Sequence, residues 1–354
     1  MKKLTLFLIA FWCSNAHCAS IDKNLLNEML TTINRQYIKP IDNVKTVTAG
    51  LSGLSDLDDG FVVSHGIDRI YIYYNHKING VVPIPKDTDD ITAWVNSIAK
   101  AIENAAQISE KVALRDFEVP DLIMKRMVRN LDEHSHYYSE YEYNEDEENN
   151  AIFTLYADRM IDDILYLRIR IFNKQTGRMV EQSLKDHPDA KGVILDLRGN
   201  GGGMFNEALK VAKLFCDNEI ITYTAGRNEE NKHYYTSGEG ALYSGPLVVL
   251  IDGETASAAE VLAGGLQEQS RAEIIGAHSF GKGTIQKITL MSNGGRLVLT
   301  GEQFFTPSGK VIHKKGIEPD ICLNHIVDGR CEQTSRVNNE EDIDKAIEIL
   351  NNEI

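Results

Sequence analysis

The chain of 354 residues has little positive charge, few cysteines and no apolar run long enough to span a bilayer. Its 37 lysine and arginine residues face 52 acidic ones, which gives a net charge of −15 and a pI near 5.2. An acidic surface repels phosphate, so nucleic acid or an anionic membrane is not expected to be the main partner. The length allows one large domain or two modest ones.

None of the five cysteines stands at zinc-ligand spacing. Cys322 and Cys331 enclose a short polar loop and are expected to form a disulfide in an oxidising compartment. Cys216 lies in an apolar helical stretch and is expected to be a buried core thiol. Cys13 and Cys18 belong to the N-terminal leader or border it.

The leader, residues 1–19, has the order of a secretory signal peptide. A basic start is followed by an apolar stretch, Leu4–Trp12, that is too short to cross a bilayer, and then by Ser14 and Ala16. The small-residue spacing predicts cleavage after Ala16. The residues before Cys18 lack the pattern of a lipoprotein signal, so lipidation is not expected. The protein is therefore predicted to be periplasmic or secreted.

Residues 20–139 are predicted to be mainly helical with one β-hairpin. Apolar residues recur at helical spacing from Ile91 to Ile102 and predict one buried helix face. The stretch Ile67–Val82 is rich in Ile, Val and Tyr and is interrupted by Asn79–Gly80, which is typical of a hairpin. Residues 140–161 are acidic but lack the Asp/Asn and Gly pattern of a calcium loop, so they are predicted to be a solvated connector.

Residues 162–322 alternate strands with helices, which predicts an α/β core with a helix-covered sheet. Strands are expected at Ile164–Phe172, Gly192–Asp196, Leu247–Ile251 and Ala272–Ile275, and helices at Asn206–Phe215 and Ser257–Gln269. Residues 323–354 are the C-terminal tail. Apolar residues near its end predict a terminal helix that packs either on its own chain or on a partner.

Ser257 is a candidate nucleophile, because it stands where the strand Leu247–Ile251 gives way to a turn and then to a helix. Glu260 follows three residues later and completes a capping box, and most serines in such a position only cap a helix. A helix start is also where backbone N–H groups converge and the helix dipole stabilises negative charge, as an oxyanion requires. Both interpretations fit the local sequence.

Lys282 is the candidate general base, because it lies between Gly281 and Gly283 in a loop that backbone can approach closely. Burial disfavours the ammonium form and leaves the neutral amine that a base needs. A plain surface turn has a similar sequence, whereas a Walker-type phosphate loop needs a longer glycine spacing and a Ser or Thr after the lysine. His278 offers a Ser–His alternative, but no acidic residue is evidently placed to orient it.

A glycine-rich loop, Asp196–Gly203, directly follows the strand Gly192–Asp196. Its backbone N–H groups are free to point at a ligand, although a flexible turn before the next helix would have the same composition. A dinucleotide-binding fingerprint fits poorly, because the glycine spacing differs and no acidic residue is placed for a ribose.

Together these segments resemble the C-terminal processing, or tail-specific, serine proteases. That family carries Asp-Leu-Arg-x-Asn-x-Gly-Gly, Ser-Ala-x-Glu, Phe-Gly-Lys-Gly, Thr-Pro-x-Gly and Gly-Ile-x-Pro-Asp segments. They are matched here at 196–203, 257–260, 280–283, 306–309 and 316–320. The family's Leu-Asp-Pro-His-Ser segment also resembles Leu131–Ser135, so the resemblance covers about residues 117–139 and 162–320. Several motifs in one order are far more specific than any one alone.

The resemblance implies a role for each candidate residue. Ser257 attacks the scissile carbonyl, and Lys282, 25 residues later, accepts its proton and returns it to the leaving amine. Gln286 holds the lysine amine in place. The oxyanion hole is formed by the N–H groups of Ala258 and of Gly203 or Gly202. The implied fold is a ClpP/crotonase-like core of ββα units, and no metal or organic cofactor is called for.

One departure from the family pattern concerns the PDZ domain, which members usually carry where this chain has only the connector 140–161. The region 20–139 is a candidate lid or docking surface in its place. The implied function is an exported endopeptidase for unfolded or tail-exposed polypeptides. A non-catalytic ligand- or peptide-binding member of the same fold and a protease that depends on an adaptor protein are the alternatives. An oligomer is compatible with the sequence.

Overall fold

A computed structural model describes residues 22–115, 118–142, 156–227, 232–337 and 339–353. The expected signal peptide and most of the acidic connector lie outside the described residues. The chain divides into two compact units, each described by itself. Unit 1 comprises residues 1–143 and 287–299, and unit 2 comprises residues 144–286 and 300–354. Residues 287–299, which sequence analysis assigned to the core, thus belong to unit 1.

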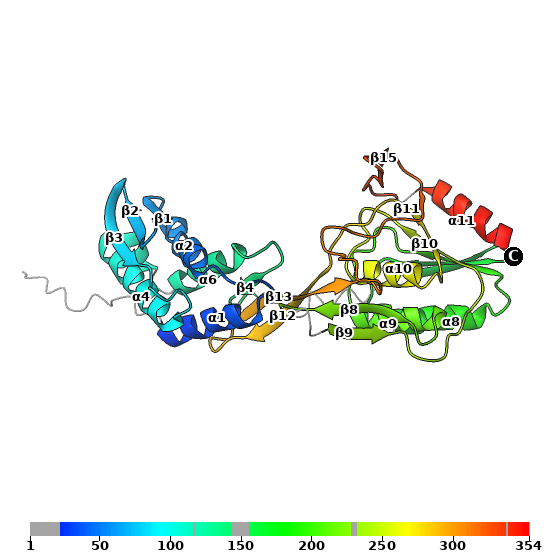
Figure 1. The fold of residues 1–354 in the computed structure, drawn as a ribbon, viewed down its shortest axis with the longest axis horizontal. Coiled ribbons are helices and arrows are strands. Elements are labelled where there is room, and N and C mark those ends of the chain that lie inside the picture. The colour runs from blue at the N-terminus through cyan, green and yellow to red at the C-terminus, as the bar shows by residue number, and fades with distance from the viewer. Residues whose placement is uncertain (1–21, 116–117, 143–155, 228–231, 338, 354) are drawn as a thin grey trace, which may run out of the picture. The chain divides into compact units, whose positions relative to one another are not determined.

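Unit 1 combines helices with a three-stranded antiparallel sheet, β1-β2-β3 (Figure 1). Its helices are α1 (Lys23–Gln36), α2 (Asn43–Leu51), α3 (Leu54–Leu57), α4 (Ile91–Ile108), α5 (Glu110–Leu114) and α6 (Val119–Arg129). Its strands are β1 (Phe61–His65), β2 (Arg69–Tyr74), β3 (Lys77–Pro83) and β4 (His136–Tyr138). On α4, the residues Trp94, Val95, Ile98 and Ile102 are buried as the helical spacing predicts.

The hairpin predicted within 67–82 exists, but its turn lies at Asn75–His76 rather than at Asn79–Gly80. Asn75 and His76 have φ angles of 50° and 66°, the left-handed pair that a two-residue hairpin turn requires. Gly80 instead lies inside β3, opposite Ile72. The prediction of the turn was wrong because Asn-Gly is the commoner turn signal, and here the strand pairing overrides it.

Unit 2 is built on a six-stranded sheet of order β14-β11-β10-β7-β6-β5, parallel except for the β5–β6 pair. The strands are β5 (Tyr156–Ile161), β6 (Ile164–Ile169), β7 (Gly192–Asp196), β10 (Leu247–Ile251), β11 (Glu273–Gly276) and β14 (Ile321–Cys322). Unit 2 also contains the end of β13 (Arg296–Phe305), which pairs with β8 (Ile220–Ala225), and β9 (Lys232–Thr236), which pairs with β8. The start of β13 pairs with β4 within unit 1, and β12 (Thr284–Leu290) precedes it in the chain. The tail adds a small pair, β15 (Ile326–Val327) and β16 (Arg330–Cys331).

The predicted strands and helices of the core are close to the observed ones. Strands β7 and β10 have the predicted bounds, and helices α9 (Phe205–Phe215) and α10 (Ala258–Glu268) lie within one residue of theirs. The predicted connector is shorter than expected, because β5 occupies its last six residues, 156–161, and pairs with β6. The polar composition of this segment did not indicate a strand, because an edge strand such as β5 needs only one apolar face.

Alternate residues of the central strands face opposite ways and bury two separate clusters. On one face, Leu195 and Val249 pack with α8 (Thr176–Asp186), α9 and α10. On the other face, Ile194 and Val248 pack with α11 (Glu340–Glu353). Figure 1 shows α11 across the sheet from α8 and α9. The terminal helix therefore packs on its own chain, which the sequence left undecided.

Two observations concern the cysteines and the membrane. Cys322 and Cys331 are joined by a disulfide. Cys216 is a free thiol that is 4% exposed, and burial raises its pKa to about 11, so it is an inert core residue.

Within the described ranges, no helix combines the length and apolar character that a bilayer crossing needs.

A buried charge cluster ties α11 to the sheet. Arg198 donates through Nε and Nη2 to the two oxygens of Asp196, at 2.9 and 2.7 Å, and through Nη1 to Asp342 Oδ2 at 3.1 Å. Arg336 donates to the same Asp342 through Nε at 3.0 Å. Two arginines and two aspartates balance each other, which allows the charges of Asp196, Arg198 and Asp342 to be buried beside a partly exposed Arg336.

Replacing Asp342 by alanine should lower the unfolding free energy of unit 2 by about 3–5 kcal/mol, because Arg336 then loses its carboxylate partner and the buried Arg198 keeps only Asp196. Calorimetry, which resolves separate unfolding transitions, is the measurement. Glu348→Ala is the control on the same helix. Glu348 is exposed and, among the residues described, pairs with Lys345 alone, so its loss should cost at most about 0.5 kcal/mol. Equal effects of the two substitutions would contradict the assignment.

Candidate active site

The candidate residues lie on three loops that follow the parallel strands β7, β10 and β11 at their carboxyl ends. These are loop A (197–204), which carries the glycines, loop B (252–257), which ends at Ser257, and loop C (277–283), which contains Lys282. Carboxyl ends of adjacent parallel strands share one edge of the sheet, where α/β proteins place their ligands. The fold therefore gathers three motifs that are far apart in the sequence.

Ser257 is the N-cap of α10 and has a conformation that few residues other than glycine adopt. Its φ is 57° and its ψ is −121°. Such strain persists only where the surroundings impose it, and it places the side chain on a sharp strand-to-helix turn. Gly202 of loop A lies against this turn, since a Cβ atom on Gly202 would stand 2.7 Å from Ser257 Cβ. The side chain of Ser257 is partly exposed.

Glu260 links the turn of Ser257 to loop C. Its carboxylate has no solvent exposure, and its Oε2 atom accepts the N–H of Ser257 and the N–H of Lys282, each at 2.8 Å. Its Oε1 atom accepts the Gly281 N–H at 2.6 Å and the Ser279 hydroxyl at 2.5 Å. Burial raises the pKa of Glu260, and the four donors oppose that shift. One oxygen thus holds the backbones of both candidate catalytic residues.

Lys282 is partly buried, and the backbone that follows it packs closely against the backbone of His313. A Cβ atom on the next residue, Gly283, would lie 2.3 Å from the backbone nitrogen of His313, so only glycine fits there. Among the residues that the structure describes, Lys282 Nζ forms no ion pair or hydrogen bond. The amine is therefore not already engaged with a carboxylate.

Gln286 does not hold Lys282 in this structure. Its Nε2 atom donates to the hydroxyls of Thr284 and Thr300, at 3.0 and 3.3 Å. No hydrogen bond joins it to Lys282 within the described part of the chain. The two threonines fix the amide so that Oε1, the atom able to accept from an amine, remains available.

The two expected oxyanion donors differ in availability. The N–H of Gly202 donates to Asn200 Oδ1 at 2.8 Å, so this N–H is already engaged. The N–H groups of Gly203 and Ala258 have no acceptor among the described residues. Ala258 is the first residue of α10, where the helix dipole favours negative charge. The pair Gly203 and Ala258 is therefore the candidate.

Loops A and B are cross-linked through Asp252 and Asn200. Asp252 Oδ1 accepts the N–H groups of Gly199 at 2.9 Å and Thr255 at 3.1 Å. The carbonyl of Asn200 accepts the N–H of Ala256 at 2.8 Å. Both anchors are fully buried, so each bond is made where water does not compete.

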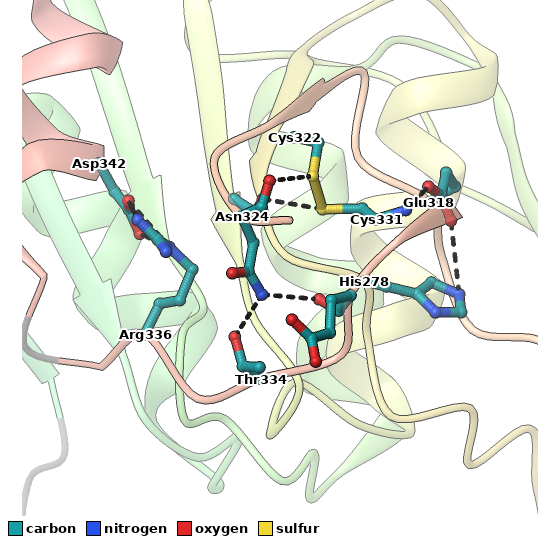
Figure 2. The surroundings of a disulfide bond; sticks show 10 residues. His278, Glu318, Cys322, Asn324, Cys331, Thr334, Arg336 and Asp342 are labelled. Carbon is teal, nitrogen blue, oxygen red and sulfur yellow. Dashed lines mark hydrogen bonds and ion pairs between the residues drawn. A yellow bond between two sulfur atoms is a disulfide. The ribbon is translucent and has the colours of Figure 1, made fainter. Parts of the chain in front are cut away.

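His278 does not take part in a Ser–His arrangement. Its Nε2 atom lies 2.6 Å from the carbonyl of Lys315 and 3.8 Å from Glu318 Oε2, and Figure 2 shows the ring directed at Glu318. Nor do the described residues contain a group of three His, Cys, Asp or Glu side chains that could hold a metal ion.

Comparison with known families agrees with this geometry. Residues 163–323, which include all three loops, match peptidase family S41. The chain contains a peptidase family S41 domain. S41 enzymes are serine peptidases that use a Ser–Lys dyad. The C-terminal processing proteases are homologues of this chain.

The similar curated proteins match less than half of this chain. A carboxy-terminal-processing protease of Bartonella bacilliformis is 39% identical over 172 residues, which cover 47% of this chain and 40% of that protein. A carboxyl-terminal-processing protease of Synechocystis sp. is 38% identical over 157 residues, covering 44% of this chain and 36% of that protein. The chain thus spans less than half the length of these relatives.

Solved structures confirm the fold. The photosystem II D1 C-terminal processing protease aligns with a TM-score of 0.53 and 18% identity over 93% of this chain and 97% of that one. A lipoprotein from Streptococcus agalactiae aligns with a TM-score of 0.54 and 17% identity over 90% and 99%. The predicted ClpP/crotonase-like α/β fold with N-terminal helices is therefore confirmed.

The role of Glu260 in the S41 domain leads to a prediction about stability. Glu260→Gln replaces one acceptor oxygen by an NH₂ group that faces two donors, so the unfolding free energy of unit 2 should fall by about 1–3 kcal/mol. Denaturant unfolding followed by circular dichroism checks the value. Glu254→Gln, an exposed position in loop B, is the matched control and should change stability by less than about 0.5 kcal/mol. A Glu260→Gln variant with the same unfolding free energy as the wild type would refute the four-donor arrangement.

Proposed function

We propose that the protein is a serine endopeptidase in which Ser257 is the nucleophile and Lys282 the general base. The observation that carries the proposal is the Glu260 carboxylate, one oxygen of which accepts the N–H groups of both residues. A binding protein of the same fold has no evident need to fix the backbones of a strained serine and a loop lysine on one acceptor.

The proposed mechanism uses groups that the structure holds ready. Neutral Lys282 takes the proton of the Ser257 hydroxyl as Oγ attacks the scissile carbonyl, and it later returns that proton to the leaving amine. The N–H groups of Gly203 and Ala258 stabilise the oxyanion of the tetrahedral intermediate. Gln286 Oε1 accepts a hydrogen bond from the lysine amine. Water then attacks the acyl-enzyme. Lys282 accepts the proton of that water and returns it to Ser257 Oγ as the acyl group leaves.

The proposed substrates are unfolded or tail-exposed polypeptides. The relatives' names describe carboxyl-terminal processing, which supports a site that accepts a chain near its end. We propose further that the chain acts without a PDZ domain in the segment 140–161, so that selection of substrates depends on another surface or on an adaptor protein. The region 20–139 is the candidate surface.

The proposed location is the periplasm or the exterior, after removal of a signal peptide. The disulfide Cys322–Cys331 supports this proposal, because disulfides persist mainly in oxidising compartments. Labelling of the mature N-terminus after expression in a Gram-negative host tests it. An uncleaved leader on a protein recovered from the cytoplasm would contradict it.

Digestion of β-casein by the wild type, Ser257→Ala and Lys282→Ala tests the catalytic roles. Each substitution should lower kcat by at least about 10³-fold, because each removes one member of a unit. Lys315→Ala is the control, because Lys315 is exposed and its side chain has no partner among the described residues. Equal activity of all four proteins would refute the mechanism. A folded but inactive wild type would favour the binder or, if an envelope extract restores cleavage, the adaptor.

A further inference from the structure

The short segment between the disulfide and α11 contacts every loop of the candidate site. We call residues Cys331–Val337 the strap. Figure 2 shows its course from the Cys322–Cys331 disulfide past Asn324 and Thr334 to Arg336, with Asp342 of α11 at its far end. None of its residues belongs to the proposed dyad or oxyanion hole.

The strap meets loop C through Gln333, whose Nε2 atom donates to the carbonyl of Ser279 at 2.7 Å. The hydroxyl of the same Ser279 donates to Glu260 Oε1, and Glu260 Oε2 holds the Lys282 N–H. A strap side chain is therefore two hydrogen-bonded residues away from the backbone of the proposed base.

The strap meets loop B through its own backbone. The Thr334 carbonyl accepts the N–H of Gly253 at 2.7 Å, and the Arg336 N–H donates to Asp252 Oδ2 at 2.8 Å. Packing is close here, since a Cβ atom on Gly253 would lie 2.9 Å from Thr334 N. Asp252 is the residue that already cross-links loops A and B through its other oxygen.

The strap meets loop A at the buried charge cluster. Arg198 Nη1 donates to the carbonyl of Arg336 at 3.1 Å and to Asp342 Oδ2 at 3.1 Å. Gly199 lies against the last strap residue, because a Cβ atom there would stand 2.7 Å from Val337 Cγ2. The strap thus reaches each of the three loops within seven residues.

Both ends of the strap are fixed. At its start, the disulfide attaches Cys331 to Cys322 of β14, and the Cys331 N–H donates to Glu318 Oε1 at 2.6 Å. Asn324 Nδ2 reinforces this end by donating to Thr334 Oγ1 at 2.7 Å. At its other end, Arg336 pairs with Asp342 of α11. A segment held at both ends can resist movement of the loops between them.

We propose that the strap is a positioning element of the active site, in which Gln333 holds loop C and the disulfide keeps the strap under constraint. The kinetic part of the proposal rests on the proposed peptidase function. Its physical part, that the strap restrains loops A, B and C, stands independently of that function.

Gln333→Glu is the direct test, because it keeps the side-chain shape but replaces the donor by a carboxylate that only accepts. Glu332→Gln is the matched control at the neighbouring exposed position, where the side chain has no partner among the described residues. Amide hydrogen exchange of residues 277–283 and steady-state kinetics on β-casein are measured for both. We expect faster exchange and an about tenfold lower kcat for Gln333→Glu, with KM within about twofold and the thermal midpoint close to wild type. The control should match the wild type.

Cys322→Ser with Cys331→Ser tests the anchor, since it frees the start of the strap without touching the loops. Faster exchange in loops B and C and a lower kcat are expected. Unchanged exchange in both Gln333→Glu and the double variant would overturn the proposal, whatever the kinetics. Faster exchange in the variants, together with a wild type that cleaves nothing, would support the strap's restraint of the loops and reject the peptidase function instead. If the double variant does not fold, Gln333→Glu alone decides.

Discussion

The arrangement of the site depends on one carboxylate with no access to water. Glu260 accepts four hydrogen bonds, and two of them, from the N–H groups of Ser257 and Lys282, end on the same oxygen. Removing a charge from water is costly unless its lone pairs are satisfied, so the fold has few ways to bury Glu260 other than this one. That constraint fixes the distance between two backbone segments that lie 25 residues apart in the sequence. It also explains why a serine in a strained conformation persists at the start of α10.

Around this carboxylate, the S41 domain uses the shared edge of a parallel sheet. Strands β7, β10 and β11 end side by side. Asp252 and Asn200 join the loops that follow β7 and β10, and Glu260 joins the start of α10 to the loop that follows β11. The strap contacts all three loops at this edge, and Arg336 connects it to α11. Stability and positioning thus come from one network, in which the Arg198 cluster secures α11 and Glu260 secures the site.

The central strands and helices were predictable because their patterns are local. The continuous apolar runs of β7 and β10 and the spacing in α9 and α10 decide the structure without help from distant residues. The hairpin turn at Asn75–His76 was not predictable in this way, because the pairing of β2 with β3 overrides the commoner Asn-Gly turn signal. Glu260 was recognised only as a helix cap, because the Ser-x-x-Glu spacing says nothing of Gly281 and Lys282. The engaged N–H of Gly202 and the orientation of Gln286 likewise depend on contacts that no sequence spacing records.

The central claim is that Glu260 couples the backbones of Ser257 and Lys282. Its most direct test is the amide hydrogen exchange of Ser257, Gly281 and Lys282 in the wild type and in Glu260→Ala, under conditions where both remain folded. The account predicts that all three amides exchange at least about tenfold faster in the variant while the amides of β10 keep their protection. Unchanged protection at Lys282, with Ser257 alone affected, would show that Glu260 is a helix cap and nothing more.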